Sequence, residues 1–183
     1  MSIAERAIVT LEGLQFLFEV LQRRGYRVIG PTRRNAAIVY EDISDIADLP
    51  KGWTDEQDGG HYRLKKRDDE ALFGYAVGPH SWKQFLHPPV LPLWRAEKRD
   101  QDFDIIHGGE SSPRFAFVGM RSCELHAVAI QDSVFLGGPY VDSHYRVRRD
   151  GAFMVAVNCG QTGGTCFCVS MDAGPMIESR QSI

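Results

Sequence analysis

The sequence lacks any long hydrophobic run. No apolar stretch approaches the roughly 18 residues that a membrane-spanning helix needs, and Glu5 and Arg6 stand where a secretory signal would be apolar. An excess of one charge is also missing, since the net charge is -3 over 183 residues and the basic residues of 63–67 are followed at once by three acidic ones. These absences predict a cytoplasmic protein without a membrane span, and they argue against nucleic-acid binding.

Several short catalytic motifs are missing as well. The chain has no C-x-x-C pair of the thioredoxin type, no phosphate loop ending in G-K-S/T, and no G-x-G-x-x-G fingerprint. No Ser/His/Asp set and no pair of carboxylates stands out. A self-contained hydrolytic site is therefore not expected.

Cysteine is scarce, and three of the four cysteines lie close together. Cys159, Cys166 and Cys168 fall within ten residues of a glycine-rich stretch, and Cys123 stands alone upstream. In a reducing compartment, clustered thiols indicate metal or redox ligands before they indicate disulfides. We predict that the four thiolates converge on one metal site.

Four occupants are compatible with this spacing: a [4Fe-4S] cluster on four cysteines, a structural zinc ion, a thiol-based redox site, or no metal at all because the cysteines belong to the core. Zinc sites usually contain two C-x2–4-C knuckles, which this chain does not have. The spacing favours iron–sulfur, with zinc as the alternative.

Other residue types near the cysteines fit an anionic group. Gly160 and Gly164 would let the backbone approach an inorganic cluster closely. Arg121 and a helix N-terminus are expected to favour the thiolate of Cys123. His126 shares the helix face of Cys123 and is a candidate ligand, although a helix histidine with an ordinary hydrogen bond is the simpler interpretation.

The hydrophobic pattern predicts a mixed α/β fold. Helices are expected at residues 11–24, 81–86 and 122–135, with a single helical turn within 141–149. Strands are expected at residues 26–30, 36–40, 61–66, 73–77, 93–97, 115–119 and 153–157. Pro31 is expected to end the first strand. Residues 41–60 are interpreted as a surface excursion, and residues 98–112 as polar and mobile.

We expect one domain over residues 1–183, made of an N-terminal part (1–112), a cysteine part (113–175) and a polar tail (176–183). Both cysteine segments follow a short apolar strand. Because sites in open α/β sheets gather at the carboxyl ends of strands, the pattern predicts a cysteine-rich site at strand ends in the C-terminal third.

The longer motifs resemble those of one family. They are residues 119–127, 131–135, Tyr145 with Arg148 and Arg149, and residues 157–159, 165–168, 170–171 and 174–175. Together they are similar to the 4Fe-4S dicluster-domain family. Its members include the beta subunit of soluble sulfhydrogenase-type NiFe hydrogenases and a related component of anaerobic sulfite reductase.

The resemblance implies a cytoplasmic electron-transfer subunit that connects a flavin- or nicotinamide-handling subunit with a catalytic metallosubunit. A non-catalytic role in an oxidoreductase complex is then expected, with one [4Fe-4S] cluster on Cys123, Cys159, Cys166 and Cys168. Independently of the resemblance, the sequence contains a polar, arginine-rich stretch made of Asp142, Tyr145, Arg146, Arg148 and Arg149. It is either a solvated surface or a docking patch for a redox partner.

The family continues into a ferredoxin-like region with two further cluster motifs, which this chain lacks. A truncated or split member, a fragment or a stand-alone relative is therefore expected. The rival hypothesis is a non-redox scaffolding domain whose thiols bind zinc or nothing.

Overall fold

The computed structural model describes residues 7–76, 78, 80–100, 102–107 and 112–177. Its centre is a four-stranded sheet in the order β2 (Ala37–Asp42), β1 (Tyr26–Arg34), β7 (Arg114–Met120) and β8 (Phe153–Ala156). β1 pairs antiparallel with β2 and parallel with β7, and β7 pairs parallel with β8. The mixed sheet and its helices confirm the predicted α/β class.

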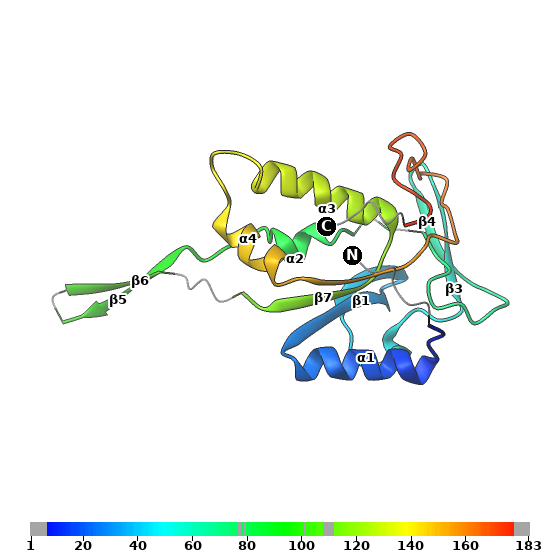
Figure 1. The fold of residues 1–183 in the computed structure, drawn as a ribbon, viewed down its shortest axis with the longest axis horizontal. Coiled ribbons are helices and arrows are strands. Elements are labelled where there is room, and N and C mark those ends of the chain that lie inside the picture. Colours follow the sequence, from blue (N-terminus) through cyan, green and yellow to red (C-terminus); the bar gives the residue numbers. More distant parts are fainter. Residues whose placement is uncertain (1–6, 77, 79, 101, 108–111, 178–183) are drawn as a thin grey trace.

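Helices cover both faces of this sheet (Figure 1). α1 (Leu11–Arg23) lies on one face, and α2 (Lys83–Leu86), α3 (Ser122–Phe135) and α4 (Ser143–Asp150) lie on the other. In the described part of the chain no helix is long and apolar enough to cross a membrane.

Strand β7 supplies the core on both sides, because successive side chains of a strand point to opposite faces. Phe115 and Phe117 pack in the cluster that also contains residues of α2 and α3, whereas Ala116 and Val118 pack in the cluster that contains residues of α1. A strand buried on both faces reads as a continuous apolar run, which is why residues 115–119 were recognisable in the sequence.

The prediction that Pro31 ends the first strand is wrong, since β1 runs on to Arg34. Pro31 lies opposite Tyr40 of β2. The pairing of β1 with β7 stops at Ile29. Proline has no N–H to donate and is tolerated where no ladder bond is required, so the strand continues past it.

The surface excursion predicted for residues 41–60 is also wrong in part. It contains the short 3-10 helix η1 (Ile46–Asp48) and the strand β3 (Trp53–Asp58), which pairs with β4 (His61–Lys66) through a turn at Gly59 and Gly60. The expected partner of β4, residues 73–77, forms bends at 73 and 75 and no strand up to residue 76, and residue 77 lies outside the described residues.

Residues 98–112 were predicted to be polar and mobile, yet they contain most of a second hairpin. β5 (Trp94–Arg99) pairs with β6 (Asp102–His107), and the hairpin projects from the body of the molecule. Charged residues are frequent in this hairpin, which is why β6 was not recognised in the sequence. Ion pairs join Arg95 to Glu97 at 3.0 Å and Arg99 to Asp104 at 3.1 Å. Residues 101 and 108–111, and 178–183 of the predicted tail, lie outside the described residues.

Candidate metal centre

Two of the four cysteines follow neighbouring parallel strands. Cys123 lies in the first turn of α3, directly after β7, and Cys159 follows β8. The strands are in register through Val118 opposite Val155, and Val157 N donates to Met120 O at 2.7 Å just beyond them. Carboxyl ends of adjacent parallel strands meet at one edge of the sheet, so the sheet brings these two segments together as the sequence predicted.

The cysteine loop (residues 159–168) leaves this edge and lies against β3. Gly164 N donates to Gln57 O at 3.0 Å, and Thr165 Oγ1 donates to Gln57 Oε1 at 3.2 Å. The contact is tight, because a Cβ on Gly164 would lie 2.7 Å from Gln57 O. The hairpin of β3 and β4 is therefore a support for the cysteine loop, a role that the sequence did not reveal.

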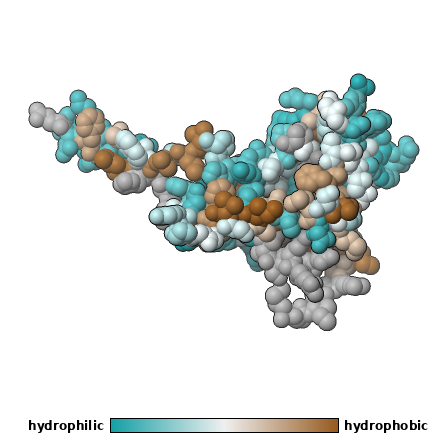
Figure 2. Space-filling view, turned by 90° about the horizontal axis from the view of Figure 1, so that it is seen from above, coloured by the Kyte–Doolittle hydropathy of each residue, from teal (hydrophilic) through white to brown (hydrophobic). Residues whose placement is uncertain are grey.

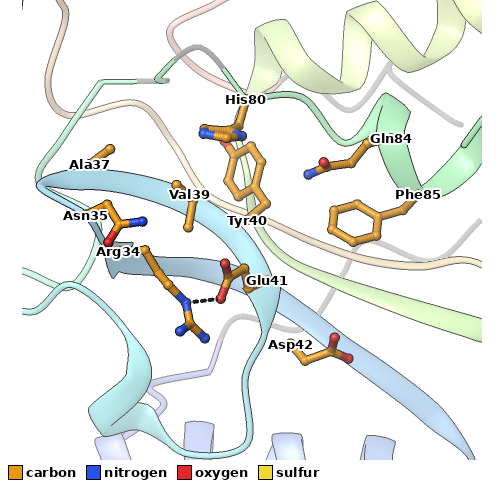
Figure 3. A pocket seen from close by; sticks show the side chains of 10 residues that line it. All are labelled: Arg34, Asn35, Ala37, Val39, Tyr40, Glu41, Asp42, His80, Gln84 and Phe85. Carbon is orange, nitrogen blue, oxygen red and sulfur yellow. Dashed lines mark hydrogen bonds and ion pairs between the residues drawn. The ribbon is translucent and has the colours of Figure 1, made fainter. Parts of the chain in front are cut away.

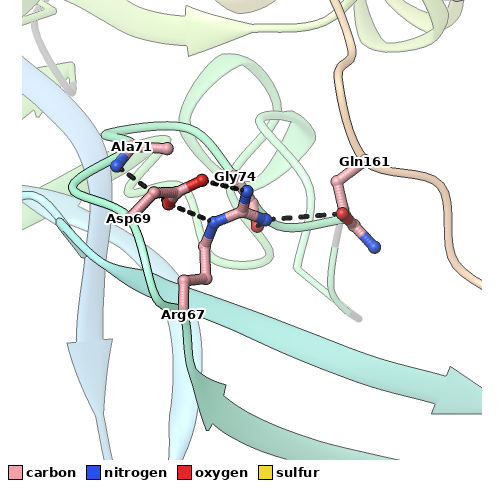
Figure 4. Close-up of polar contacts among 5 residues, drawn as sticks. All are labelled: Arg67, Asp69, Ala71, Gly74 and Gln161. Carbon is pink, nitrogen blue, oxygen red and sulfur yellow. Dashed lines mark hydrogen bonds and ion pairs between the residues drawn. The ribbon is translucent and has the colours of Figure 1, made fainter.

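Arg67 provides a second anchor for the same loop (Figure 4). Its guanidinium donates two hydrogen bonds of 2.6 Å to Asp69, one of 3.1 Å to Gly74 O, and one of 3.4 Å to Gln161 Oε1. Hydrogen bonding to Arg67 lowers the pKa of Asp69 to about 2. Gln161 O in turn accepts a hydrogen bond from Cys159 Sγ at 3.2 Å.

Beyond the cysteine loop the chain turns back toward the sheet edge. Cys168 O accepts hydrogen bonds from Met171 N at 3.2 Å and from Ala173 N at 2.9 Å. Cys159 N then donates to Pro175 O at 3.0 Å. These bonds close residues 159–175 into one structured segment.

The thiols of Cys123, Cys159 and Cys168 are half-buried, and that of Cys166 is exposed. Burial raises the pKa of Cys123 to about 11, and nearby Glu124, Cys159 and Cys168 add to the rise against the opposing charge of Arg121. Arg121 favours the thiolate of Cys123 as expected, but in the metal-free chain desolvation outweighs its effect on the pKa.

Within the described ranges, no three His, Cys, Asp or Glu side chains lie close enough together to hold a metal ion. Cys166 instead accepts a hydrogen bond from Gly163 N at 3.3 Å. His126 is half-buried on α3 and is not among the groups that shift the pKa of Cys123. The four-cysteine ligand set remains a prediction.

A buried polar network that sequence reasoning missed lies behind the cysteines. Arg121 is 1% exposed, stacks over the ring of Tyr75 at 4.5 Å and donates through Nη2 to Tyr75 O. The backbone N–H of Arg121 donates to Glu124 Oε2 at 2.9 Å, and Glu124 Oε1 accepts from the Tyr40 hydroxyl at 2.5 Å. The signal that could have revealed this network is a glutamate three residues after the N-cap residue of a helix.

The charge of Arg121 acts on the sulfur site. Burial alone would lower the pKa of Arg121, but Tyr75, Tyr40, Glu124 and Cys159 raise it. Arg121 Nε and Nη1 are buried and have no hydrogen-bond acceptor among the described residues. Two such donors on a buried cation beside cysteines fit an anionic occupant, and a cluster carrying four thiolates is anionic. The residues present therefore fit an iron–sulfur cluster.

A cavity of about 600 Å³ lies between β2 and α2, and Tyr40 is one of the residues that line it (Figure 3). Tyr40, His80, Gln84 and Phe85 line its upper part, and the ion pair of Arg34 with Glu41 lies below them. No cysteine lines this cavity, so it is separate from the candidate metal centre.

The arginine-rich helix α4 was a candidate docking patch. Arg149 is instead mostly buried and pairs with Asp132 at 3.0 Å, and Asp132 also accepts from Tyr145 at 2.7 Å. Arg148 donates to His144 O within α4 at 3.0 Å. Of these two arginines, Arg149 therefore ties α4 to α3, and Arg148 bonds within its own helix.

The thiols should differ in reactivity. In the metal-free chain at pH 8, we expect iodoacetamide to modify exposed Cys166 first and Cys123 last. With a pKa of about 11, only about one Cys123 in a thousand is a thiolate at that pH. Peptide mass mapping over time measures the order, and equal rates for Cys123 and Cys166 would contradict the burial of Cys123.

Comparisons with known proteins give one relative and no family assignment. No family model and no solved structure matches the chain. The chain is 26% identical over 145 residues to "Sulfhydrogenase 2 subunit beta" of Pyrococcus furiosus. The match covers 79% of this chain and 35% of the relative, so the chain spans about a third of that protein's length. The chain is thus distantly similar to a hydrogenase beta subunit.

Proposed function

We propose that this chain is an iron–sulfur electron-transfer part of a cytoplasmic multi-subunit oxidoreductase, with one [4Fe-4S] cluster held by Cys123, Cys159, Cys166 and Cys168. The observation that carries the proposal is the meeting of two cysteine-bearing strand ends beside a buried arginine whose Nε and Nη1 have no acceptor among the described residues. The distant similarity to a sulfhydrogenase beta subunit supports it.

Each residue of the site would have a defined task. Cys123 and Cys159 lie on the rigid sheet edge, whereas Cys166 and Cys168 come from the loop that β3 supports. Arg121 would offset the negative charge of the thiolates, and the glycines at 160 and 164 would let the backbone lie close to the occupant. When bound, the cluster supplies one-electron oxidation and reduction.

The similarity also supports a place among other subunits. In the proposed complex, one partner handles flavin or nicotinamide and another carries the catalytic metal centre. The present chain would pass electrons between them without a reaction of its own.

Purification without oxygen tests the proposal. We expect about four iron and four acid-labile sulfide per chain, with a broad visible absorption, and a large loss of iron in Cys168→Ser. Thr165→Ser keeps the loop and the ligand set and serves as the control. A colourless protein with about one zinc per chain would establish the scaffolding alternative, and iron unchanged by Cys168→Ser would refute the ligand set.

A further inference from the structure

Strand β2 is one edge of the central sheet, because it pairs with β1 on one side only. The cavity between β2 and α2 lies along this edge, and side chains from both faces of β2 line it (Figure 3). Ala37, Val39 and Glu41 come from one face of the strand, and Tyr40 and Asp42 come from the other. An edge strand presents backbone N–H and C=O groups that the sheet does not use.

The pairing of β2 with β1 shows which backbone groups of β2 point outward. In an antiparallel pair, residues that bond across the ladder alternate with residues whose N–H and C=O point away from it. Ile43 N donates to Val28 O at 2.9 Å just beyond the strand, so Ile43 is a bonding residue. By alternation, the backbone groups of Asp42 and Tyr40 point away from β1.

Two further observations agree with this alternation. Tyr40 lies opposite Pro31, which has no N–H to give to a ladder bond. Ile38, two residues before Tyr40, donates its N–H outward to the Tyr62 hydroxyl at 3.0 Å. In the described part of the chain, the backbone groups of Tyr40 and Asp42 have no such partner. They are therefore open at the edge where the cavity lies.

Side chains on the two sides of this edge form a groove. On the α2 side, Phe85 packs at the margin of the core, and Tyr40 is stacked on Trp82 with ring centroids 3.9 Å apart. On the other side, Arg34 and Glu41 form an exposed ion pair. Neighbouring side chains of an added strand would point alternately to these two walls. The apolar wall favours an apolar residue, and the ion pair favours polar residues on either side of it.

The groove has no counterpart on the other hairpin edges described above. The β5–β6 hairpin also has open edges, but it projects from the body of the molecule (Figure 2), so a strand added there would meet only the hairpin itself. On β2, the edge near Ile38 is already covered, since a Cβ on Gly78 would lie 3.3 Å from Ile38 O. The open part of the edge is thus residues 40–42, a length that suits one narrow strand.

We propose that this groove binds an extended peptide segment of a partner protein, which adds to β2 as a further strand. The backbone of the segment bonds with the outward groups of Tyr40 and Asp42, as in other complexes formed by strand addition. An apolar side chain lies against Phe85, between polar neighbours. A single segment fits better than a second copy of this chain, because the copy's own α2 lies beside the same edge. Peptide binding does not require iron, so it goes beyond the proposed function.

Hydrogen exchange of the metal-free chain tests whether the edge is open. Asp42 is exposed and its N–H points outward, whereas the N–H of Glu41 faces Gly30 of β1. We expect the Asp42 amide to exchange at least tenfold faster than the Glu41 amide, because only the latter is held in the ladder. Equal protection of the two amides would overturn the proposal, since the edge would then be covered already.

A phage-displayed library of random hexapeptides, selected on the metal-free chain, tests the ligand. We expect enriched peptides in which polar and apolar residues alternate, and slower exchange of the Asp42 amide when such a peptide binds. Asp42→Pro should weaken binding at least tenfold, because proline is tolerated on an edge strand but has no N–H to donate. The control is Asp42→Ala, which removes only the surface ion pair with Arg27 and should change binding less than about threefold.

N-methylation of an enriched peptide gives a test that needs no protein variant. Methylation of one alternating set of its amides should abolish binding, and methylation of the other set should not, because only one set faces β2. Equal effects of the two sets, equal binding by Asp42→Pro and Asp42→Ala, or a selection that enriches no peptide would each overturn the proposal. Dimerisation that Asp42→Pro abolishes in sedimentation would also overturn it, by identifying a second copy as the occupant.

Discussion

Replacing Gly164 by alanine is expected to detach the cysteine loop from β3 and to remove most of the bound iron. The new Cβ would lie 2.7 Å from Gln57 O. That oxygen belongs to a strand held by its pairing with β4, where Gln57 lies opposite Tyr62. Backbone in a paired strand cannot yield cheaply, so the overpacking should cost about 1–3 kcal/mol. A loss of that size weakens docking of the loop by a factor of about 5 to 150.

The matched control lies in the turn between β3 and β4. A Cβ on Gly59 meets nothing within 4 Å, so Gly59→Ala should keep its iron. Iron content and hydrogen exchange at the residue-164 amide are measured for both variants. Normal iron in Gly164→Ala, or an equal loss in Gly59→Ala, would show that β3 does not position the loop.

Replacing Arg121 by methionine should destabilise the metal-free chain by about 1–3 kcal/mol, because the buried Tyr75 O loses its donor and the buried carboxyl of Glu124 loses a nearby positive charge. Glu124 is buried, and burial raises its pKa while Tyr40 and Arg121 oppose the rise. Without Arg121 the carboxylate would be ionised with less compensation. A buried carboxyl whose pKa is raised destabilises the fold more as pH increases. The loss of stability in Arg121→Met should therefore be larger at pH 8 than at pH 5.

Urea unfolding of the metal-free chain measures this effect without any contribution from iron. Arg27→Met is the control, because Arg27 pairs with Asp42 at 2.6 Å on the surface and should cost about 1 kcal/mol or less. Adding Glu124→Gln to Arg121→Met should restore part of the stability, since the unpaired buried charge is gone. Similar losses in Arg121→Met and Arg27→Met would contradict a structural role for the buried cation.

The elements nearest the candidate site were the easiest to predict from the sequence. α3 spans residues 122–135 as expected, and β7 and β8 agree with the predicted strands within a residue or two. The two strands are continuous apolar runs, which local rules identify, and the glycines and proline at 137–139 mark the end of α3. Because parallel strands end at the same edge, even the meeting of Cys123 and Cys159 followed from the pattern.

The supporting residues were not predictable in the same way. The strand β4 was predicted at residues 61–66, but its partner β3 carries many charged and polar side chains and lies in the stretch that was interpreted as a surface excursion. Gln57 and Arg67 act on the cysteine loop across about a hundred residues of sequence. Contacts of this range depend on the tertiary fold, and no local pattern reports them.

Arg121 illustrates a second limit. A basic residue before a helix usually lies at the surface, and only the structure shows it enclosed by Tyr75 and hydrogen-bonded through its backbone to Glu124. Burial also outweighs the expected effect of Arg121 on Cys123, so the pKa of this thiol is raised although a nearby cation lowers it. Desolvation is a property of the packed molecule, so the sequence alone could not predict its sign.

The pairing of β8 with β7 has a consequence for the order of assembly. Cys159 reaches Cys123 only after β8 has joined the sheet, and pairing between distant segments of a chain forms late in folding. The loop with Cys166 and Cys168 then still has to close onto β3. In the proposed function, iron would therefore bind after folding. In a partly folded chain that lacks β8 in the sheet, the thiols would be separate and each would be open to other metals or to oxidation.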